Sequence, residues 1–249
     1  MSKKINVTVW NEEDEGPKHQ PAYPEGIHNA IAAFLKSDEQ IGTLRTATQS
    51  QPEHGLTQEV LDDTDVLLWW GHIHHGEVSD EIVERVKQRV LGGMGLLVLH
   101  SGHASKIFSS LLGTNTRNLR WRENNERERV WVMEHNHPIT AGIGEYIEIP
   151  ESETYGEHFD IPAPDELIFI SWYSGGDIFR SGCTFKRGLG KIFFFSPGHE
   201  SYRIYDMPQI QQVIKNAIGW AAPIAYPTLL TQHQEVSPED LYKKANGLE

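Results

Sequence analysis

Three short apolar runs, each followed closely by histidine, constrain the fold of this chain more than any other feature. They are residues 65–75 (Asp-Val-Leu-Leu-Trp-Trp-Gly-His-Ile-His-His), 95–103 (Gly-Leu-Leu-Val-Leu-His-Ser-Gly-His) and 191–200 (Lys-Ile-Phe-Phe-Phe-Ser-Pro-Gly-His-Glu). Runs of Val, Leu, Ile and aromatic residues closed by Gly or Ser are typical of buried strands in a parallel or mixed sheet. In open α/β sheets, ligands bind beyond the carboxyl ends of the strands. We therefore expect these segments to bring imidazoles to one edge of a sheet.

Strand and helix signals alternate through the first half of the chain. Strands are predicted over residues 5–10, 43–47, 65–70 and 96–99. Helices are predicted to start near Pro24, Thr57, Ser79 and Ala104. Ser79 is a typical N-cap, because Asp80 and Glu81 follow it in the first helical turn. Alternation with this rhythm indicates βαβ units, so the expected fold class is α/β with a parallel sheet.

The second half of the chain is richer in strand signals. Strands are predicted within residues 117–137 and over 167–173, 178–185 and 191–195. A hairpin-type turn, Gly175-Gly176-Asp177, joins two of them, and a closing helix is predicted over 208–220. After residue 223 the chain becomes polar, with a helix start at Ser237. We therefore expect one domain over residues 1–223, with an added β-rich region, and a C-terminal tail over 224–249 that carries a short helix.

The charge of the chain limits its partners. Lys and Arg number 22 and Asp and Glu 35, and the resulting net charge of −13 repels nucleic acid and anionic membranes. No apolar run approaches the ~20 residues that span a bilayer, and the first residues enter a strand without room for a secretory signal. The single cysteine, Cys183, excludes an intrachain disulfide and is expected to be inert within a strand. We expect a cytoplasmic protein that binds neither nucleic acid nor membrane.

The segment from Gly92 to Ala104 has the pattern of a strand, a sharp turn and a helix. Such a turn exposes one side chain and directs backbone N–H groups toward a bound anion or carbonyl oxygen. His100 and Ser101 occupy the turn, where hydrolases place a nucleophile, and Ser101 with a nearby imidazole could form a nucleophile–base pair. The alternative is that Ser101 caps the following helix and His100 hydrogen-bonds to the backbone.

Three histidines cluster at residues 72–75. In an extended chain, His72 and His74 point to the same side and His75 points to the other. His72 and His75 are the candidate metal ligands, and with a carboxylate from another strand they would suit a divalent metal such as Zn²⁺. No HExxH or CxxC motif accompanies them, so solvated or structurally hydrogen-bonded histidines are the alternative. No nucleotide cofactor is expected.

Two further segments carry candidate acid–base groups. Residues 151–160 are dense in carboxylates interleaved with Tyr and His, and a glycine beside Glu157 would permit a close approach of the backbone. The alternative for this segment is a solvated acidic loop. His199 and Glu200 follow the most aromatic strand of the chain, and His199 is the strongest single catalytic candidate. The alternative is a loop histidine that hydrogen-bonds to the backbone.

These residues resemble those of the trehalose-utilisation (ThuA-like) family, which is similar in fold to the class I glutamine amidotransferases. The resemblance covers roughly residues 3–223 and rests on Trp69-Trp-Gly-His72, Gly93 to His103, Tyr155-Gly-Glu157, Phe179-Arg-Ser-Gly182 and Pro197-Gly-His-Glu200. It implies a flavodoxin-like, doubly wound, mostly parallel sheet with helices on both faces. It also implies a role in the utilisation of trehalose or related disaccharides.

The chain departs from the amidotransferases at the residues that carry their chemistry. Their sharp turn holds a nucleophilic cysteine, where this chain has His100 or Ser101, and Cys183 does not match that position. Their catalytic His and Glu are separated by one residue, whereas His199 and Glu200 are adjacent. Without a thiolate at the turn, glutamine hydrolysis through a thioester is not expected.

The preferred hypothesis is an enzyme that acts on a disaccharide or its keto derivative by His/Glu acid–base chemistry, assisted by a metal if one binds. Such an enzyme would be an isomerase, a lyase or a hydrolase. The candidate catalytic residues are His199, Glu157, His100, Ser101 and Glu200. The candidate sugar-binding residues are Trp70, His103, Tyr155 and Trp172. The alternatives are a non-catalytic sugar-binding or regulatory protein and a hydrolase that uses Ser101. The aromatic second half predicts a homo-oligomer.

Overall fold

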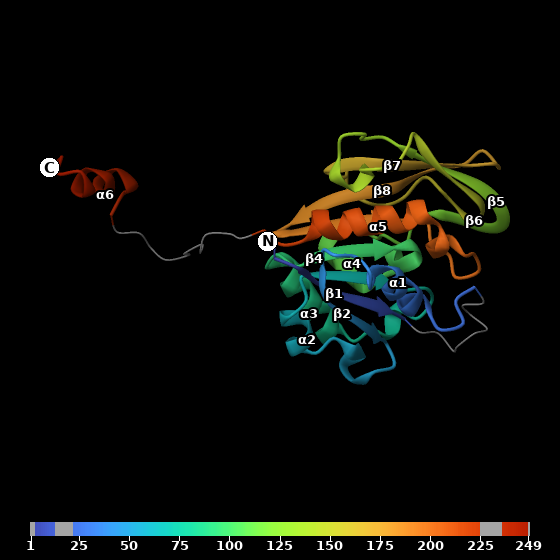
Figure 1. Cartoon of the computed structure of the whole chain (residues 1–249), viewed down its shortest axis with the longest axis horizontal. Coiled ribbons are helices and arrows are strands. Elements are labelled where there is room, and N and C mark those ends of the chain that lie inside the picture. Colours follow the sequence, from blue (N-terminus) through green and yellow to red (C-terminus); the bar gives the residue numbers. More distant parts are fainter. Residues whose placement is uncertain (1–2, 13–21, 225–235, 249) are drawn as a thin grey trace.

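The structure, a computed structural model, describes residues 3–12, 22–224 and 236–248 (Figure 1). The strands are β1 (Ile5–Asn11), β2 (Ile41–Thr48), β3 (Val66–Trp70), β4 (Gly95–Leu99), β5 (Arg120–Val132), β6 (Tyr146–Gly156), β7 (Glu166–Tyr173), β8 (Ile178–Arg187) and β9 (Gly190–Phe195). The helices are α1 (Ile27–Leu35), α2 (Gln58–Asp62), α3 (Asp80–Leu91), α4 (Lys106–Leu112), α5 (Pro208–Ala221) and α6 (Pro238–Ala245).

All of these strands belong to one sheet, in the order β2-β1-β3-β4-β9-β8-β7-β5-β6. From β2 to β9 the neighbours pair in parallel. From β9 to β6 they pair in antiparallel. The α/β class is therefore confirmed, but the expectation of a mostly parallel sheet holds only for the first part. The β-rich region of the second half continues the same sheet, because its hairpins add strands in antiparallel.

Helices cover both faces of the parallel part. α1 and α5 pack on one face against strand residues that include Val9, Leu68 and Leu97. α2, α3 and α4 pack on the other face against residues that include Leu67 and Phe194. Because successive side chains of a strand point to opposite faces, a strand covered on both sides must be apolar throughout. This is why β3, β4 and β9 were recognisable as unbroken apolar runs.

Hydrogen-bonding side chains set where α3 and α4 begin. Ser79 caps α3 as predicted, since its Oγ accepts a hydrogen bond from the Ile82 N–H at 3.3 Å. α4 is capped by Ser105, whose Oγ accepts from the Phe108 N–H at 3.3 Å. The alternative in which Ser101 caps this helix is therefore wrong. Residues 100–104 instead form a 3₁₀ turn between β4 and α4.

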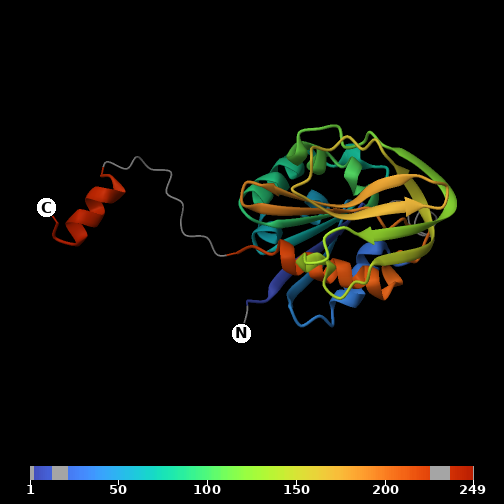
Figure 2. The ribbon, with the colours of Figure 1, turned by 90° about the horizontal axis from the view of Figure 1, so that it is seen from above.

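The antiparallel part curves over one end of the parallel part (Figure 2). The pairing of β5 with β6 shifts register between Arg122 and Glu126, and Asn125 in this stretch has a positive φ of 53°. Such a bulge bends a strand and increases its twist. The Tyr202 hydroxyl donates a hydrogen bond of 2.6 Å to Asn125 Oδ1, which ties the bend to the loop after β9. The ends of β5 and β6 consequently reach the carboxyl edge of β4 and β9.

The sequence did not predict the second half of β6, but it did predict the C-terminal helix. Residues 151–156 were interpreted as an acidic loop, but they form the second half of β6. α6 begins after Ser237, as predicted, and all its residues are exposed. The acidic residues 13–15 and most of the predicted tail before α6 lie outside the described residues. No helix in the described ranges has the length and apolar character needed to cross a bilayer.

Candidate active site

Three neighbouring strands end level with one another, and a histidine follows each of them. Trp70 of β3 pairs with Leu99 of β4, which pairs with Phe195 of β9. His72, His100 and His199 lie just beyond these residues. The ring centroids of His100 and His199 are 5.2 Å apart, and those of His72 and His199 are 6.1 Å apart. The predicted convergence of imidazoles at one sheet edge is therefore confirmed.

β6 adds a carboxylate and a phenol to this edge. Glu153 and Tyr155 are two positions apart, so they project from the same face of the strand. Glu153 Oε2 lies 3.1 Å from His100 Nε2, and both side chains are buried. The Tyr155 ring stacks on the His100 imidazole, with centroids 5.2 Å apart and planes 11° apart. Strand β6 thus completes a site that β3, β4 and β9 begin.

His100 occupies the sharp turn after β4, in the left-handed backbone region, with a φ of 50°. A non-glycine residue is strained in this region, and such strain is typical of functional turns. The His100 Nδ1–H donates a 2.7 Å hydrogen bond to the Ser196 carbonyl oxygen, which leaves Nε2 facing Glu153. Burial alone would lower the pKa of His100, but the hydrogen bond and charge of Glu153, with the charge of Glu200, raise it. We assign His100 as an imidazolium paired with Glu153.

His199 has the opposite protonation pattern. The Ser201 N–H donates a 3.1 Å hydrogen bond to His199 Nδ1, so the neutral ring carries its proton on Nε2. Burial, followed by the charges of His100 and His72, lowers the pKa of His199 to about 2. His199 Nε2 is buried and has no hydrogen-bond partner among the described residues. His199 is therefore a neutral hydrogen-bond donor, and its expected role as the main base is not supported.

Glu200 is a buried carboxyl group whose ionisation is shifted close to neutrality. Burial raises the pKa of its carboxyl group to about 7, and the charge of His100 opposes this only in part. Glu200 Oε1 lies 3.2 Å from His72 Nε2 and 3.4 Å from His199 Nε2. A general acid or base works best when its pKa is near the working pH. The arrangement favours Glu200 as the proton-transfer group.

Glu12, just after β1, holds the loop that carries His72 in place. Its Oε1 accepts hydrogen bonds of 2.6 Å from both the Ile73 and His74 N–H groups, and its Oε2 accepts one of 2.8 Å from the His72 N–H. Glu12 is only 2% exposed. Hydrogen bonds to a carboxylate are stronger than those to neutral acceptors, so Glu12 acts as a positioning residue for His72.

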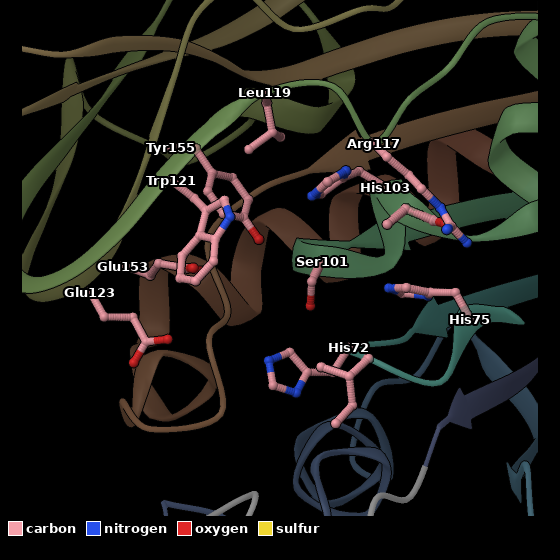
Figure 3. A pocket seen from close by; sticks show the side chains of 12 residues that line it. His72, His75, Ser101, His103, Arg117, Leu119, Trp121, Glu123, Glu153 and Tyr155 are labelled. Carbon is pink, nitrogen blue, oxygen red and sulfur yellow. The ribbon is translucent and has the colours of Figure 1, made fainter.

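A pocket of about 300 Å³ opens at this edge (Figure 3). A volume of this order suits a small ligand. Its lining combines imidazoles, carboxylates and apolar side chains: His72, Ile73, His75, Ser101, His103, Ala104, Arg117, Leu119, Trp121, Glu123, Glu153 and Tyr155. Trp121 and Ile73 are 65% and 56% exposed, so their apolar faces are open to a ligand. The predicted His103, Tyr155, Ser101, His72 and His75 line this pocket. His100, His199 and Glu200 do not line it. They contact its lining residues instead: Glu200 lies 3.2 Å from His72, and His100 and His199 lie 3.1 and 3.9 Å from Glu153.

Three predicted site residues lie elsewhere or are already engaged. Glu157 forms a two-point ion pair with Arg180, at 2.8 and 2.9 Å. Burial alone would raise the pKa of Glu157, but this ion pair and two backbone hydrogen bonds lower it. Trp70 is a core residue, 1% exposed, and its Nε1–H donates to the Gly198 carbonyl oxygen. Trp172 on β7 packs near the Arg129 guanidinium and does not line the pocket. These three assignments are therefore corrected to structural roles.

Ser101 is not arranged as an activated nucleophile. Its hydroxyl donates a 2.6 Å hydrogen bond to the Gly71 carbonyl oxygen. A base would have to displace this hydrogen bond before it could take the proton. The single cysteine offers no substitute, because Cys183 is buried in β8 and burial raises its pKa to about 12. The geometry gives the serine-hydrolase hypothesis no support.

The structure places different residues at the candidate metal site from those that the sequence predicted. His72, His199 and Glu200 form a candidate ligand group, whereas the predicted partner His75 lies beside Glu12, with Nδ1 3.6 Å from Oε2. The spacings of 3.2 and 3.4 Å between ligand atoms would suit a tetrahedral ion such as Zn²⁺. However, His199 Nε2 carries a proton while Nδ1 accepts from Ser201. Metal binding there requires that hydrogen bond to break, so donation to a ligand fits this trio better.

The ion pair between His100 and Glu153 makes a pH-dependent contribution to stability. A histidine whose pKa is raised by folding contributes stability that is fully present below the unfolded pKa, about 6.5, and is lost as pH rises through the folded value. Glu153→Gln should therefore lower the free energy of unfolding by ~1–3 kcal/mol below about pH 6, and by much less at about pH 9. Urea unfolding at both pH values, with exposed Glu151→Gln as control, measures this. An equal loss at both values contradicts the pairing.

Several pocket or support residues were missed in the sequence, among them Glu12, Glu153, Arg117 and Trp121. Strand alternation was a usable signal for Glu153, because it stands two residues before Tyr155. Glu12 follows the first strand at the same sheet edge as the histidines, which is also a usable signal. Arg117 and Trp121 lie in a stretch where Arg and Glu residues are interleaved, and nothing local distinguished them.

Comparisons with known proteins agree with this fold. A family model described as trehalose utilisation (ThuA) matches residues 6–221, whereas no curated protein matches the sequence. A ThuA-like protein from Parabacteroides merdae is 12% identical, with a TM-score of 0.67 over 88% of this chain and 90% of that chain. A cytoplasmic protein from Salmonella typhimurium is 13% identical, with a TM-score of 0.59 over 88% of this chain and all of that one (100%). A β-galactosidase from Rahnella sp. R3 is 10% identical, with a TM-score of 0.58 over 88% of this chain but 31% of that chain.

Proposed function

Because this chain belongs to the ThuA family, described as trehalose utilisation, we propose that it is an enzyme that acts on a disaccharide or its keto derivative by acid–base catalysis. The observation that carries the proposal is Glu200, a buried carboxyl group with a pKa of about 7, beside a neutral His199 and a charged His100. Environments that separate the protonation states of neighbouring groups are typical of acid–base sites.

With a keto sugar, each group has a distinct role. The Glu200 carboxylate takes the proton from the carbon next to the carbonyl group. The His199 Nε2–H donates to the carbonyl oxygen and stabilises the negative charge that develops there. A neutral imidazole can do this because its Nε2–H is already a hydrogen-bond donor and the ring does not have to be protonated first. The charge of His100 lowers the cost of ionising Glu200, whereas the charge of Glu153 raises it.

The pocket can also hold the sugar itself. The exposed Trp121 ring offers a flat apolar face to a pyranose. Tyr155, whose hydroxyl lies 3.4 Å from His100 Nε2, lines the same pocket. The proposal includes a cytoplasmic location and a homo-oligomeric state, in keeping with the single cysteine and the aromatic second half of the sequence.

Proton exchange tests the proposed reaction directly. The protein is incubated with keto and unmodified disaccharides in D₂O, and the products are examined by NMR. We expect deuterium to enter the carbon next to the carbonyl group of a keto disaccharide, with turnover. Saturable sugar binding with neither exchange nor product from any sugar would contradict the proposal and favour the sugar-binding or regulatory alternative.

A metal-assisted reaction is a second candidate, favoured by the tetrahedral spacing of His72, His199 and Glu200. Elemental analysis of protein purified without an affinity-metal column distinguishes the two. About one equivalent of a transition metal per chain would place the metal at this edge, either in this group or in the second candidate group, His100, Glu153 and His199. Absence of metal after soaking with Zn²⁺ and Mn²⁺ would support the acid–base site without a metal.

A further inference from the structure

One end of the pocket carries two buried imidazoles, and a serine hydroxyl lies beside them. Figure 3 shows His75 and His103 on one side of the pocket and Glu123 and Glu153 on the other, with Ser101 between them. His75 and His103 are each 6% exposed, and Ser101 is 8% exposed. The proton transfers proposed above do not involve these three side chains, so their polarity is evidence about the ligand itself.

All three of these groups face a ligand as hydrogen-bond acceptors. The His103 Nδ1–H donates a 2.8 Å hydrogen bond to the Thr116 carbonyl oxygen, which leaves Nε2 with a lone pair and no proton. His75 Nδ1 faces the Glu12 carboxylate, 3.6 Å from Oε2, so its proton lies on that side and Nε2 is again an acceptor. The Ser101 hydroxyl already donates a 2.6 Å hydrogen bond to a backbone carbonyl oxygen, so its own oxygen accepts.

Both imidazoles are neutral and held in place. Burial lowers the pKa of His75 to about 3 and that of His103 to about 4. The His103 ring makes edge-to-face contacts with Tyr155 and Phe159, with centroids 5.4 and 5.6 Å apart. His75 Nε2 is buried and has no hydrogen-bond partner among the described residues. Since buried acceptors are normally hydrogen-bonded, this atom calls for a donor from outside the protein.

A ligand for this end must bring hydrogen-bond donors and no charge. The lone pair on each Nε2 repels the oxygens of a carboxylate or phosphate group. An ammonium group is disfavoured as well, because the positive charge of Arg117 acts on both imidazoles. The hydroxyl groups of a sugar are uncharged donors, and they match these acceptors.

We propose that His75, His103 and Ser101 form a subsite that accepts hydrogen bonds from the hydroxyl groups of an uncharged sugar ring. The carbonyl oxygen of a keto sugar can only accept hydrogen bonds, so this subsite excludes it. The carbonyl group is thereby directed toward His72, which lines the pocket and lies 3.2 Å from Glu200. The subsite holds the ring with intact hydroxyls and orients the oxidised ring toward the acid–base groups. This inference rests on the proposed function and specifies how its substrate is bound.

Analogues of one sugar test the subsite without any mutation. The probes are methyl α-D-glucoside and its deoxy and deoxyfluoro derivatives at each hydroxyl-bearing carbon, titrated into the full chain and followed by NMR. Fluorine replaces the hydroxyl oxygen but cannot donate a hydrogen bond. A site built around substrate hydroxyls rejects analogues that lack them, because its buried polar groups are left unpaired. We expect at least one position at which the deoxy and the fluoro derivative both bind at least about tenfold more weakly than the parent.

Paired substitutions assign this loss to the imidazoles. His103→Asn keeps an amide at the Nδ1 position and removes the Nε2 acceptor, whereas His103→Gln places an amide oxygen near Nε2. In His103→Asn the parent glucoside should bind about tenfold more weakly, and the penalty for the deoxy derivative should fall to within about twofold. His103→Gln should retain most of both, and His75→Asn should behave like His103→Asn. The matched control is His135→Asn, at an exposed histidine that does not line the pocket.

The outcomes separate this inference from the proposed function. Glu200→Gln should abolish turnover and leave the pattern of deoxy and fluoro penalties intact. Penalties without proton exchange on any keto disaccharide would support the subsite and contradict only the acid–base reaction. The subsite is overturned if the glucoside does not bind, or if the parent and all its derivatives bind equally. Penalties that persist unchanged in both His75→Asn and His103→Asn would also overturn it.

Discussion

Replacing Glu200 with Gln should lower kcat by about 10²–10⁴-fold, because the variant removes the proton-transfer group and keeps its shape. Wild-type kcat/KM should rise with pH through about 7, where the Glu200 carboxyl ionises. The variant should lose this limb of the pH profile. Substrate affinity should change little, since Gln keeps the volume and hydrogen-bonding capacity of the side chain.

Stability provides the folding control for this variant. A carboxyl group whose pKa is raised from 4.5 to about 7 contributes stability that is present below 4.5 and is lost as pH rises through about 7. Glu200→Gln should therefore be more stable than wild type above about pH 7. Glu123→Gln, at the more exposed rim carboxylate, should keep kcat within a few-fold. If Glu200→Gln retains near-normal turnover on a verified substrate, Glu200 is not the acid–base group.

Replacing His199 with Asn should lower kcat by about 10²–10³-fold, as expected for the loss of one preorganised donor to a developing oxyanion. Asn is the sharpest substitution here because its Oδ1 can still accept the hydrogen bond from the Ser201 N–H, as in an Asx turn. The substitution removes the Nε2–H group that donates into the site.

The pH profile separates donor and base roles for His199. If His199 is a donor, His199→Asn keeps the ionisation near pH 7 that belongs to Glu200. His199→Ala also removes the Ser201 hydrogen bond, so it should lose more stability than Asn at similar kcat. Loss of the pH 7 limb in His199→Asn would instead return His199 to the role of base.

The sheet edge could be predicted from sequence because its strands are buried on both faces. Residues 66–70, 95–99 and 190–195 are fully apolar or nearly so, and the histidines that follow them had to lie together once the strands paired in parallel. His100, His199, Glu200 and His72 were found in this way. Their protonation could not be found, because it depends on partners such as Ser196 and Glu153 that are distant in the sequence.

The errors arose where a polar residue has a buried partner on another strand. Glu157 looked like a free acid in a loop, but Arg180 on β8 binds its carboxylate at two points. The alternative of a solvated acidic loop over residues 151–160 fails for Glu153, which enters the site because β6 curves over the edge of the sheet. Trp70 was predicted to bind sugar, but it lies in the core with the apolar run around it. Trp121, which was not predicted, has the exposed ring at the pocket.

The most direct test of the account is the ionisation of Glu200 itself. Carboxyl groups of ¹³C-glutamate-labelled protein can be titrated by NMR in wild type and in Glu200→Gln, without any substrate. We predict one carboxyl resonance that titrates near pH 7 in wild type and is missing from the variant. If no glutamate titrates between about pH 6 and 8, or if that resonance persists in the variant, the acid–base site described above is wrong.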